Sequence, residues 1–189
     1  MSWFKSALAC SVSFLTTASF TVSASAQSAD NFISGPGTAI YLGGATLLPL
    51  ITDGDKGGQH SLRVLDTVAT SAALCYGIKE VVRTPRPDNE RELDSFPSCH
   101  AMTAFSAARI QSKYHPDWAI AWYAGAALIG YSRVSLNRHR WSEVLIGAGL
   151  GYLVGELELS QKNGLILFPL IREDSKGDTV YGLQMKASF

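Results

Sequence analysis

Five segments of helical length, most of them apolar and rich in alanine or glycine, constrain the fold of this chain more than any other feature. They are residues 38–51, 61–82, 98–113, 118–132 and 140–157. In the second segment apolar residues recur at helical spacing, and Thr84-Pro85-Arg86-Pro87 then ends the helix because proline cannot continue it. No uninterrupted apolar run reaches the ~18–20 residues that span a bilayer. The pattern predicts an all-α helical bundle, soluble or peripheral to a membrane rather than integral to it.

Glycine, proline and charged residues mark where these helices are expected to stop. We expect Gly35-Pro36-Gly37 to break the chain before the first helix, residues 53–58 to form a loop, and residues 133–138 to form a second polar loop. Four glycines of the last helix are expected to let a neighbouring helix approach closely: Gly147, Gly149, Gly151 and Gly155.

The start of the chain has the composition of a secretory signal. Lys5 is followed by an apolar and hydroxyl-rich stretch over residues 7–22, and Ala24-Ser25-Ala26 places small residues where a signal peptidase cuts. We expect residues 1–26 to be removed, the protein to be exported to the periplasm or cell envelope, and residues 27–160 to form one helical domain. The alternative is that the segment is the first helix of the fold.

The end of the chain changes from helical to alternating periodicity. Residues 164–171 and 179–189 are β-like runs on either side of a charged turn. We expect residues 161–189 to form a β-hairpin extension that packs on the bundle, mediates a dimer or contacts a membrane.

The charge balance argues against nucleic acid as a partner. The chain has 16 Lys and Arg and 16 Asp and Glu, whereas a general nucleic-acid binder needs a basic excess. Local clusters of basic residues are then more informative than the total.

Three short segments combine basic residues with histidines. They are Lys79 with Arg86-Pro87, then Pro97-Ser98-Cys99-His100, then Ser132-Arg133 with His139 and Glu143. Taken singly they have structural explanations, such as a lysine at a helix end or a surface pair four residues apart. Taken together they match the needs of a phosphate group, because arginine forks bind two oxygens at once and N–H groups at a helix start point at an anion.

The two histidines add a way to do chemistry on that phosphate. Glu143 lies one helical turn after His139, so its carboxylate can accept the Nδ1 proton and leave Nε2 free as a nucleophile. His100 can donate a proton to the leaving oxygen. This scheme needs a neutral His139 and a protonated His100, and it predicts a bell-shaped pH profile.

In order and in chemistry, the three segments resemble the motifs of the type-2 phosphatidic acid phosphatase superfamily. That superfamily includes bacterial acid phosphatases, membrane lipid phosphatases and vanadium haloperoxidases. Its pattern is Lys-x6-Arg-Pro, then Pro-Ser-Gly-His, then Ser-Arg-x5-His-x3-Asp, and the resemblance spans residues 79–143. It implies a helical bundle with the site at helix ends, hydrolysing phosphomonoesters, or lipid phosphates and diphosphates, with no metal or other cofactor.

The resemblance also implies a role for each residue. The phosphate-binding residues would be Lys79, Arg86, Ser98, Cys99 and Arg133. The cations would hold the phosphoryl oxygens, and the main chain and hydroxyl of Ser98 with the Cys99 backbone would complete the cradle. His139 would attack phosphorus to form a phosphohistidine, His100 would protonate the leaving group, and Glu143 would orient His139. Water would then hydrolyse the phosphoenzyme.

Two positions depart from the family pattern: Cys99 stands where the family has glycine, and Glu143 where it has aspartate. The extra methylene of Glu143 changes how its carboxylate reaches His139, which affects turnover more than reaction class. Cys75 precedes Lys79 by one helical turn and so shares its face. We hypothesise a Cys75–Cys99 disulfide in an oxidising compartment, with two buried free thiols as the alternative.

Two other functions stay open on the sequence. The same cradle can hold vanadate, so a vanadate-dependent haloperoxidase is one alternative, although the chain is short for it. A non-catalytic phosphate-binding protein of the envelope is the other, encouraged by Cys99 and Glu143. The expected partner is a phosphate-containing small molecule or a lipid headgroup, and peripheral contact with a membrane is left open. The aromatic-rich segment 118–131 either borders a lipid tail or fills the core.

Overall fold

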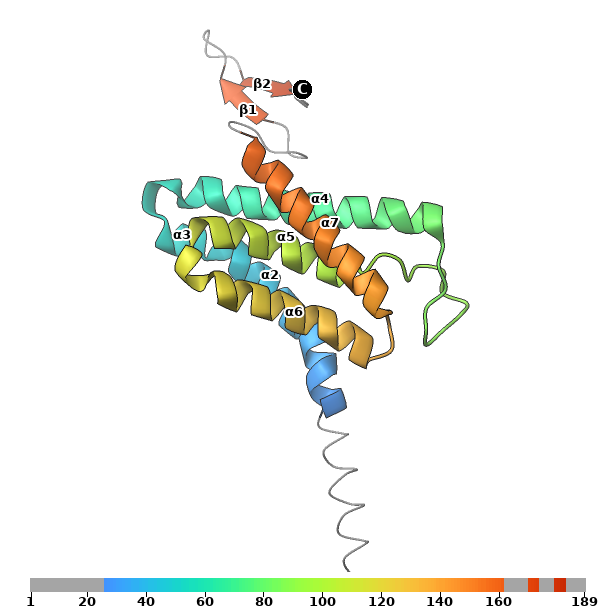
Figure 1. The fold of residues 1–189 in the computed structure, drawn as a ribbon. Helices are drawn as coiled ribbons and strands as arrows, with labels where there is room; N and C mark the ends of the chain where they lie inside the picture. The colour runs from blue at the N-terminus through green and yellow to red at the C-terminus, as the bar shows by residue number, and fades with distance from the viewer. Residues whose placement is uncertain (1–25, 162–169, 174–178, 183–189) are drawn as a thin grey trace, which may run out of the picture.

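The computed structural model describes residues 26–161, 170–173 and 179–182 of the chain. The predicted signal segment therefore lies outside the described residues, apart from Ala26, and so does most of the predicted C-terminal hairpin. The described part of the chain is a bundle of helices with two short strands, which confirms the predicted helical class (Figure 1).

The bundle is built around one central helix. Its main helices are α2 (Thr38–Leu47), α4 (Gly57–Val82), α5 (Cys99–Tyr114), α6 (Ala119–Ser135) and α7 (Trp141–Ser160). α5 packs against the other four, and its inward residues Ala101, Ala104, Ala107 and Ala108 are fully buried. These small side chains let four helices approach one, which explains why an alanine-rich helix occupies the centre.

Short helical turns connect the main helices. They are α3 (Pro49–Thr52) and two 3₁₀ turns, η2 (Gly54–Lys56) and η3 (Pro116–Trp118). Residues 53–58, predicted as a loop, are thus mostly a tight helical turn, and α4 begins at Gly57. The start of α4 passes against the Pro49 carbonyl, where any side chain at Gly57 would clash.

The expected break at Gly35-Pro36-Gly37 is wrong. Residues 26–47 are helical throughout, and Ile33–Gly37 form a π-helical segment, η1, that runs directly into α2. Pro36 lacks a backbone N–H, and a wider helical turn accommodates the missing hydrogen bond. Proline and glycine weaken an isolated helix, but η1 packs against α6, and this tertiary contact supports it.

Glycines on one face of α7 set its distance from α5. They are Gly147, Gly151 and Gly155. A Cβ on Gly147 would lie 2.6 Å from the carbonyl oxygen of Ser98, so the first turns of α7 lie directly against the start of α5. The prediction for Gly149 is wrong, because it lies on another face and a Cβ there would meet nothing within 4 Å.

The two strands lie in the segment predicted as a hairpin. β1 (Leu170–Glu173) and β2 (Thr179–Gly182) pair antiparallel, with Leu170 opposite Gly182. Residues 162–169, 174–178 and 183–189 lie outside the described residues, so the extent of the hairpin and a boundary at residue 161 stay predictions.

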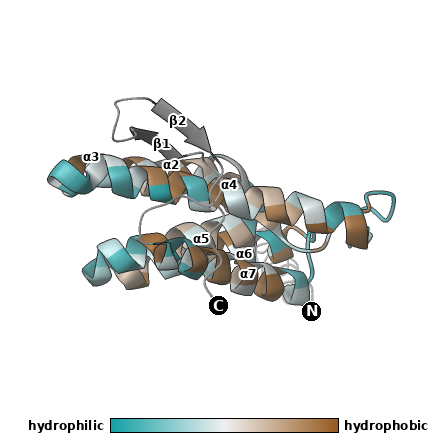
Figure 2. Ribbon diagram, turned by 90° about the horizontal axis from the view of Figure 1, so that it is seen from above, coloured by the Kyte–Doolittle hydropathy of each residue, from teal (hydrophilic) through white to brown (hydrophobic). Residues whose placement is uncertain are grey.

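Large apolar side chains are exposed on the outer helices. Figure 2 shows hydrophobic segments along α4 and α7, and Ile51, Val81 and Ile120 are each more than four-fifths exposed. Among the helices that the structure describes, none is both long and apolar enough to cross a membrane.

Candidate active site

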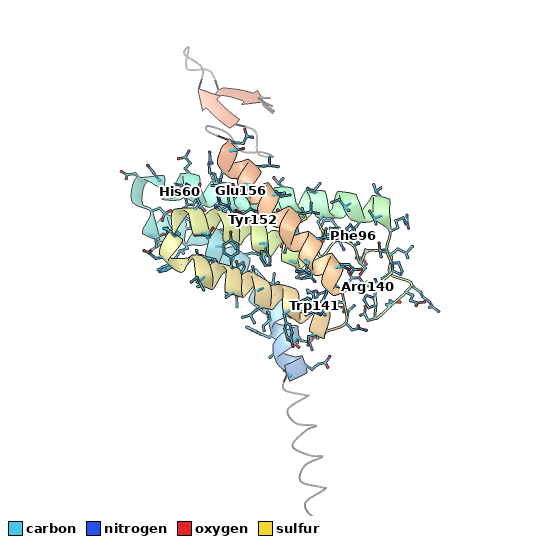
Figure 3. All side chains as sticks on the ribbon, viewed as in Figure 1. His60, Phe96, Arg140, Trp141, Tyr152 and Glu156 are labelled. Carbon is cyan, nitrogen blue, oxygen red and sulfur yellow. A yellow bond between two sulfur atoms is a disulfide. The ribbon has the colours of Figure 1, made fainter. Side chains whose placement is uncertain are left out.

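The residues predicted to carry the chemistry come from four helices whose ends meet on one side of the bundle. They are Lys79 and Arg86 at and after the end of α4, Ser98, Cys99 and His100 at the start of α5, Arg133 near the end of α6, and His139 and Glu143 at the start of α7. In Figure 3, Phe96 and Arg140 lie at this end of the bundle, whereas His60 lies at the opposite end. The site therefore lies at helix ends, as the resemblance implied.

His139 and Glu143 form a buried pair at the start of α7. The Nδ1 atom of His139 lies 3.2 Å from Oε2 of Glu143, and each residue is 3% exposed. Oε2 also accepts hydrogen bonds from the Ser95 hydroxyl at 2.6 Å and the Arg140 backbone N–H at 3.0 Å. Oε1 accepts one from the Arg140 guanidinium at 2.9 Å. The glutamate that replaces the family's aspartate thus still reaches the histidine.

The surroundings determine the protonation of this pair. Burial raises the pKa of Glu143, but hydrogen bonds, led by that from Ser95, outweigh it and leave the pKa below its usual value. Burial, followed by the nearby charges of Lys79 and Arg133, lowers the pKa of His139 to about 4. At neutral pH the ionised carboxylate accepts the Nδ1 proton, and Nε2 carries a free lone pair. This is the protonation state that the predicted mechanism needs for His139.

Lys79 and Arg133 put buried positive charge beside His139. Burial lowers the pKa of Arg133 to about 10, with the charge of Arg86 acting in the same direction, and burial also lowers the pKa of Lys79. Cations that disfavour one another's charge are stabilised when an anion binds among them. Within the described residues, the buried Nε of Arg133 and Oγ of Ser98 have no hydrogen-bond partner, which suits a phosphate oxygen.

Arg133 was expected in a polar loop, and this expectation is wrong. α6 continues through it to Ser135. The reason is tertiary, because the Arg133 guanidinium is buried and donates a hydrogen bond to the Ser34 hydroxyl of η1. A contact made between α6 and η1 leaves no trace in the local polarity of residues 133–138.

Arg86 lies near Lys79 and Arg133, and its guanidinium is already hydrogen-bonded to a carboxylate. Its Nε and Nη2 donate to the two carboxylate oxygens of Asp94 at 2.6 and 2.8 Å, and Nε lies 3.1 Å from Glu92. The Lys79 ammonium donates to the Asp94 carbonyl. Hydrogen bonding from Arg86 lowers the pKa of Asp94 to about 2. A phosphate bound at this position would have to share Arg86 with Asp94.

The Ser98 main chain is not placed as predicted. Its N–H donates to the Glu143 carbonyl at 3.2 Å, and its hydroxyl makes no capping hydrogen bond to α5. The cause is the close approach of α7, where Gly147 lies directly against Ser98. The hydroxyl of Ser98, and not its N–H, is left without a partner among the described residues.

The hypothesised disulfide is present. Cys75 and Cys99 are bonded, with their Cα atoms 5.6 Å apart. Cys75 is fully buried one turn before Lys79. The disulfide therefore ties the turn of α4 that carries Lys79 to the start of α5, where Cys99 replaces the family's glycine.

His100 lies in the same electrostatic environment as His139. Burial, followed by the charges of Arg133 and His139, lowers the pKa of His100 to about 4, and a hydrogen bond to the Ser34 backbone opposes this shift. The sequence scheme needs a protonated His100, whereas these surroundings keep the ring neutral at neutral pH. A phosphate dianion bound beside these arginines would offset their charge and raise the pKa of His100.

Four residues that the sequence did not single out contact the predicted ones: Ser34, Asp94, Ser95 and Arg140. Asp94, Ser95 and Arg140 adjoin the motifs, so their position in the chain was an available signal. Ser34 lies far upstream and had no such signal. Within the residues that the structure describes, no group of three or more His, Cys, Asp or Glu is placed to hold a metal ion.

Comparisons with known proteins identify a family and two similar proteins. A lipid A 1-phosphatase of Porphyromonas gingivalis is 42% identical over 76 residues, which are 38% of this chain and 17% of that protein's length. A crystal structure of a transmembrane PAP2-type phosphatidylglycerolphosphate phosphatase from Bacillus subtilis is similar with a TM-score of 0.47 and 28% identity, covering 80% of this chain and 93% of that one. The sequence model of the PAP2 superfamily matches residues 61–165, more than half of the chain, and this range contains all eight predicted site residues. The chain belongs to the PAP2 superfamily.

Proposed function

We propose that this protein is a metal-independent phosphatase that hydrolyses phosphomonoesters, or lipid phosphates and diphosphates, through a phosphohistidine. The observation that carries the proposal is the buried His139–Glu143 pair beside Lys79 and Arg133. A nucleophilic nitrogen held next to fixed positive charge meets the main needs of phosphoryl transfer, which are positioning and charge stabilisation.

In the first step, Nε2 of His139 attacks phosphorus. The P–N bond forms as the bond to the leaving oxygen breaks, and His100 donates a proton to that oxygen. The carboxylate of Glu143 stabilises the positive charge that develops on the ring. Lys79, Arg86 and Arg133 stabilise the equatorial oxygens and supply the positive charge that a metal ion provides in other phosphatases.

In the second step, water attacks the phosphohistidine. His100, now neutral, takes a proton from the water, the P–N bond breaks, and phosphate is released. His139 returns to its neutral form with Nδ1–H still directed at Glu143. His100 again carries the proton with which it entered the first step, and it loses this proton to solvent once phosphate has left the cations.

A lipid substrate is favoured by the surface beside the site. Tyr131 and Trp141 are half exposed, with ring centroids 6.3 Å apart, and each lies two residues from a proposed site residue. Aromatic side chains with a polar tip suit the boundary between water and lipid. Trp122 and Tyr123 pack on the core, so the predicted aromatic segment is divided between the two roles. We include export and peripheral membrane contact in the proposal.

The combination of the His139–Glu143 pair with the nearby charges of Lys79 and Arg133 favours a catalytic site over a non-catalytic phosphate-binding protein. The test is hydrolysis of p-nitrophenyl phosphate, phosphatidic acid and a lipid diphosphate in the presence of a chelator, with and without vanadate. We expect hydrolysis that vanadate inhibits, an acid-labile phosphoenzyme trapped from radiolabelled substrate, and a higher kcat/KM for lipid. Halide oxidation without hydrolysis would indicate a haloperoxidase, and neither activity would indicate a binding protein.

A further inference from the structure

Ser34 lies outside every motif of the family, yet it is next to the site. It is in the π-helical segment Ile33–Gly37, upstream of residues 61–165 that match the family. Its side chain is buried although serine is polar, being 6% exposed. A buried hydroxyl normally has a specific hydrogen-bond partner.

That partner is the guanidinium of Arg133. Nη1 of Arg133 donates to Oγ of Ser34, while its buried Nε has no partner among the described residues. An arginine fork binds phosphate well only when its plane is fixed, because its donors have a rigid geometry. The Ser34 bond occupies one side of the fork and leaves Nε for an oxyanion.

The backbone of Ser34 reaches a second site residue. A hydrogen bond between the Ser34 backbone and the His100 ring raises the pKa of His100 against burial and the arginine charges. One residue of η1 therefore contacts a proposed phosphate-binding group through its hydroxyl and affects the pKa of the proposed general acid through its backbone. Ser34 belongs to the same π-helical segment as Pro36, and such segments are frequent at functional sites.

We propose that Ser34 is a positioning residue of the phosphate site, orienting Arg133 through its hydroxyl. This inference rests on the proposed function and extends the site to the helix that precedes the matched region. The helix is also held to α6 by a hydrogen bond from the Ser135 hydroxyl to Asp30, which touches neither Arg133 nor His100. Ser135→Ala is therefore a matched control that loosens the same helix without disturbing the fork.

The experiment compares Ser34→Ala, Ser34→Thr and Ser135→Ala with the full wild-type chain. We expect Ser34→Ala to raise KM for p-nitrophenyl phosphate and the inhibition constant of vanadate about tenfold, with a much smaller change in kcat. Ser34→Thr keeps a hydroxyl and should restore most of the loss, and Ser135→Ala should leave both constants within about twofold of wild type. Equal effects of Ser34→Ala and Ser135→Ala would overturn the proposal, because both variants would then act by loosening the helix.

A binding measurement separates this inference from the proposed function. Calorimetric titration with inorganic phosphate needs no turnover, so it tests Ser34 even if the wild type hydrolyses nothing. We expect weaker phosphate binding in Ser34→Ala, and no further weakening when Ser34→Ala is added to Arg133→Ala. If Ser34→Ala does not fold, phosphate binding by Ser34→Thr decides. Binding as tight as in the wild type supports the inference. A tenfold loss of binding contradicts it, because this variant retains a hydroxyl.

Discussion

The two ends of the bundle each bring a histidine against a buried carboxylate, but the surroundings of the two pairs differ. At one end His139 faces Glu143. At the other, Nδ1 of His60 lies 2.5 Å from one oxygen of Asp53, and Nε2 of His115 lies 3.3 Å from the other. Burial raises the pKa of Asp53, and hydrogen bonds led by that from Thr52 outweigh it and leave the pKa below its usual value. The second pair is thus as well formed as the first.

The comparison teaches that a histidine–carboxylate contact is not enough to mark a catalytic site. His60 stacks on Tyr114 with centroids 3.7 Å apart, so its ring joins the start of α4 to the end of α5. The charges that act on His139 come from Lys79 and Arg133, on two other helices. The His139–Glu143 pair has buried cations of other helices beside it, and this convergence, which tertiary packing produces, is what supports the proposed chemistry there.

The largest expected difference between the two ends is in activity. His139→Ala should reduce kcat by on the order of 10⁴-fold or more and abolish the phosphoenzyme, because the nucleophile is removed. His60→Ala should leave kcat/KM within about twofold and lower the free energy of unfolding by about 1 kcal/mol, because Asp53 loses a partly buried partner. Steady-state kinetics and urea unfolding measure both. Equal losses of activity in the two variants would remove the distinction between the ends.

The next effect is on stability as a function of pH. The pKa values of His139 and His100 are about 4 in the folded protein and about 6.5 in model compounds. Between these values the unfolded chain binds more protons, so stability falls as pH decreases and is unaffected by these groups above pH ~6.5. From pH 6.5 to 5 we expect each histidine to lower the free energy of unfolding by about 1.5 kcal/mol.

Two changes test whether these two histidines cause the pH dependence of stability. His139→Gln should remove about half of the slope, because one of the two groups no longer titrates. Inorganic phosphate should flatten it, because an anion at the cation cluster raises the pKa of both histidines. The carboxyl of Asp94, with a pKa of about 2, titrates below this window. If neither change alters the slope of the free energy of unfolding against pH, groups other than these histidines cause it.

The sequence predicted much of this arrangement for a physical reason. Apolar periodicity reports local burial, so the existence of the main helices followed from it, although η1 did not. Lys79, His139 and Glu143 were found because phosphate chemistry demands such residue types at helix ends. Ser95 was missed although it lies just before the second motif, and Ser34 was missed because its contact with Arg133 joins distant segments and leaves no periodicity in the chain. The helical state of Gly35-Pro36-Gly37 was missed for the same reason, since tertiary packing overrides weak local propensity.

The smallest expected effect on activity concerns the hydroxyl group that donates a hydrogen bond to each carboxylate. Ser95 donates to Glu143 at 2.6 Å in the fully buried site, and Thr52 donates to Asp53 at the same distance on an exposed turn. Ser95→Ala should lower kcat about tenfold with KM unchanged, because the carboxylate loses the donor that orients it but phosphate keeps its own contacts. Thr52→Ala should change neither constant, and Ser95→Thr should recover part of kcat. A rise in KM without a fall in kcat would show that Ser95 acts on the phosphate-binding residues and not on the His139–Glu143 pair. Unchanged kcat and KM would show that its hydrogen bond is only a structural contact, like that of Thr52.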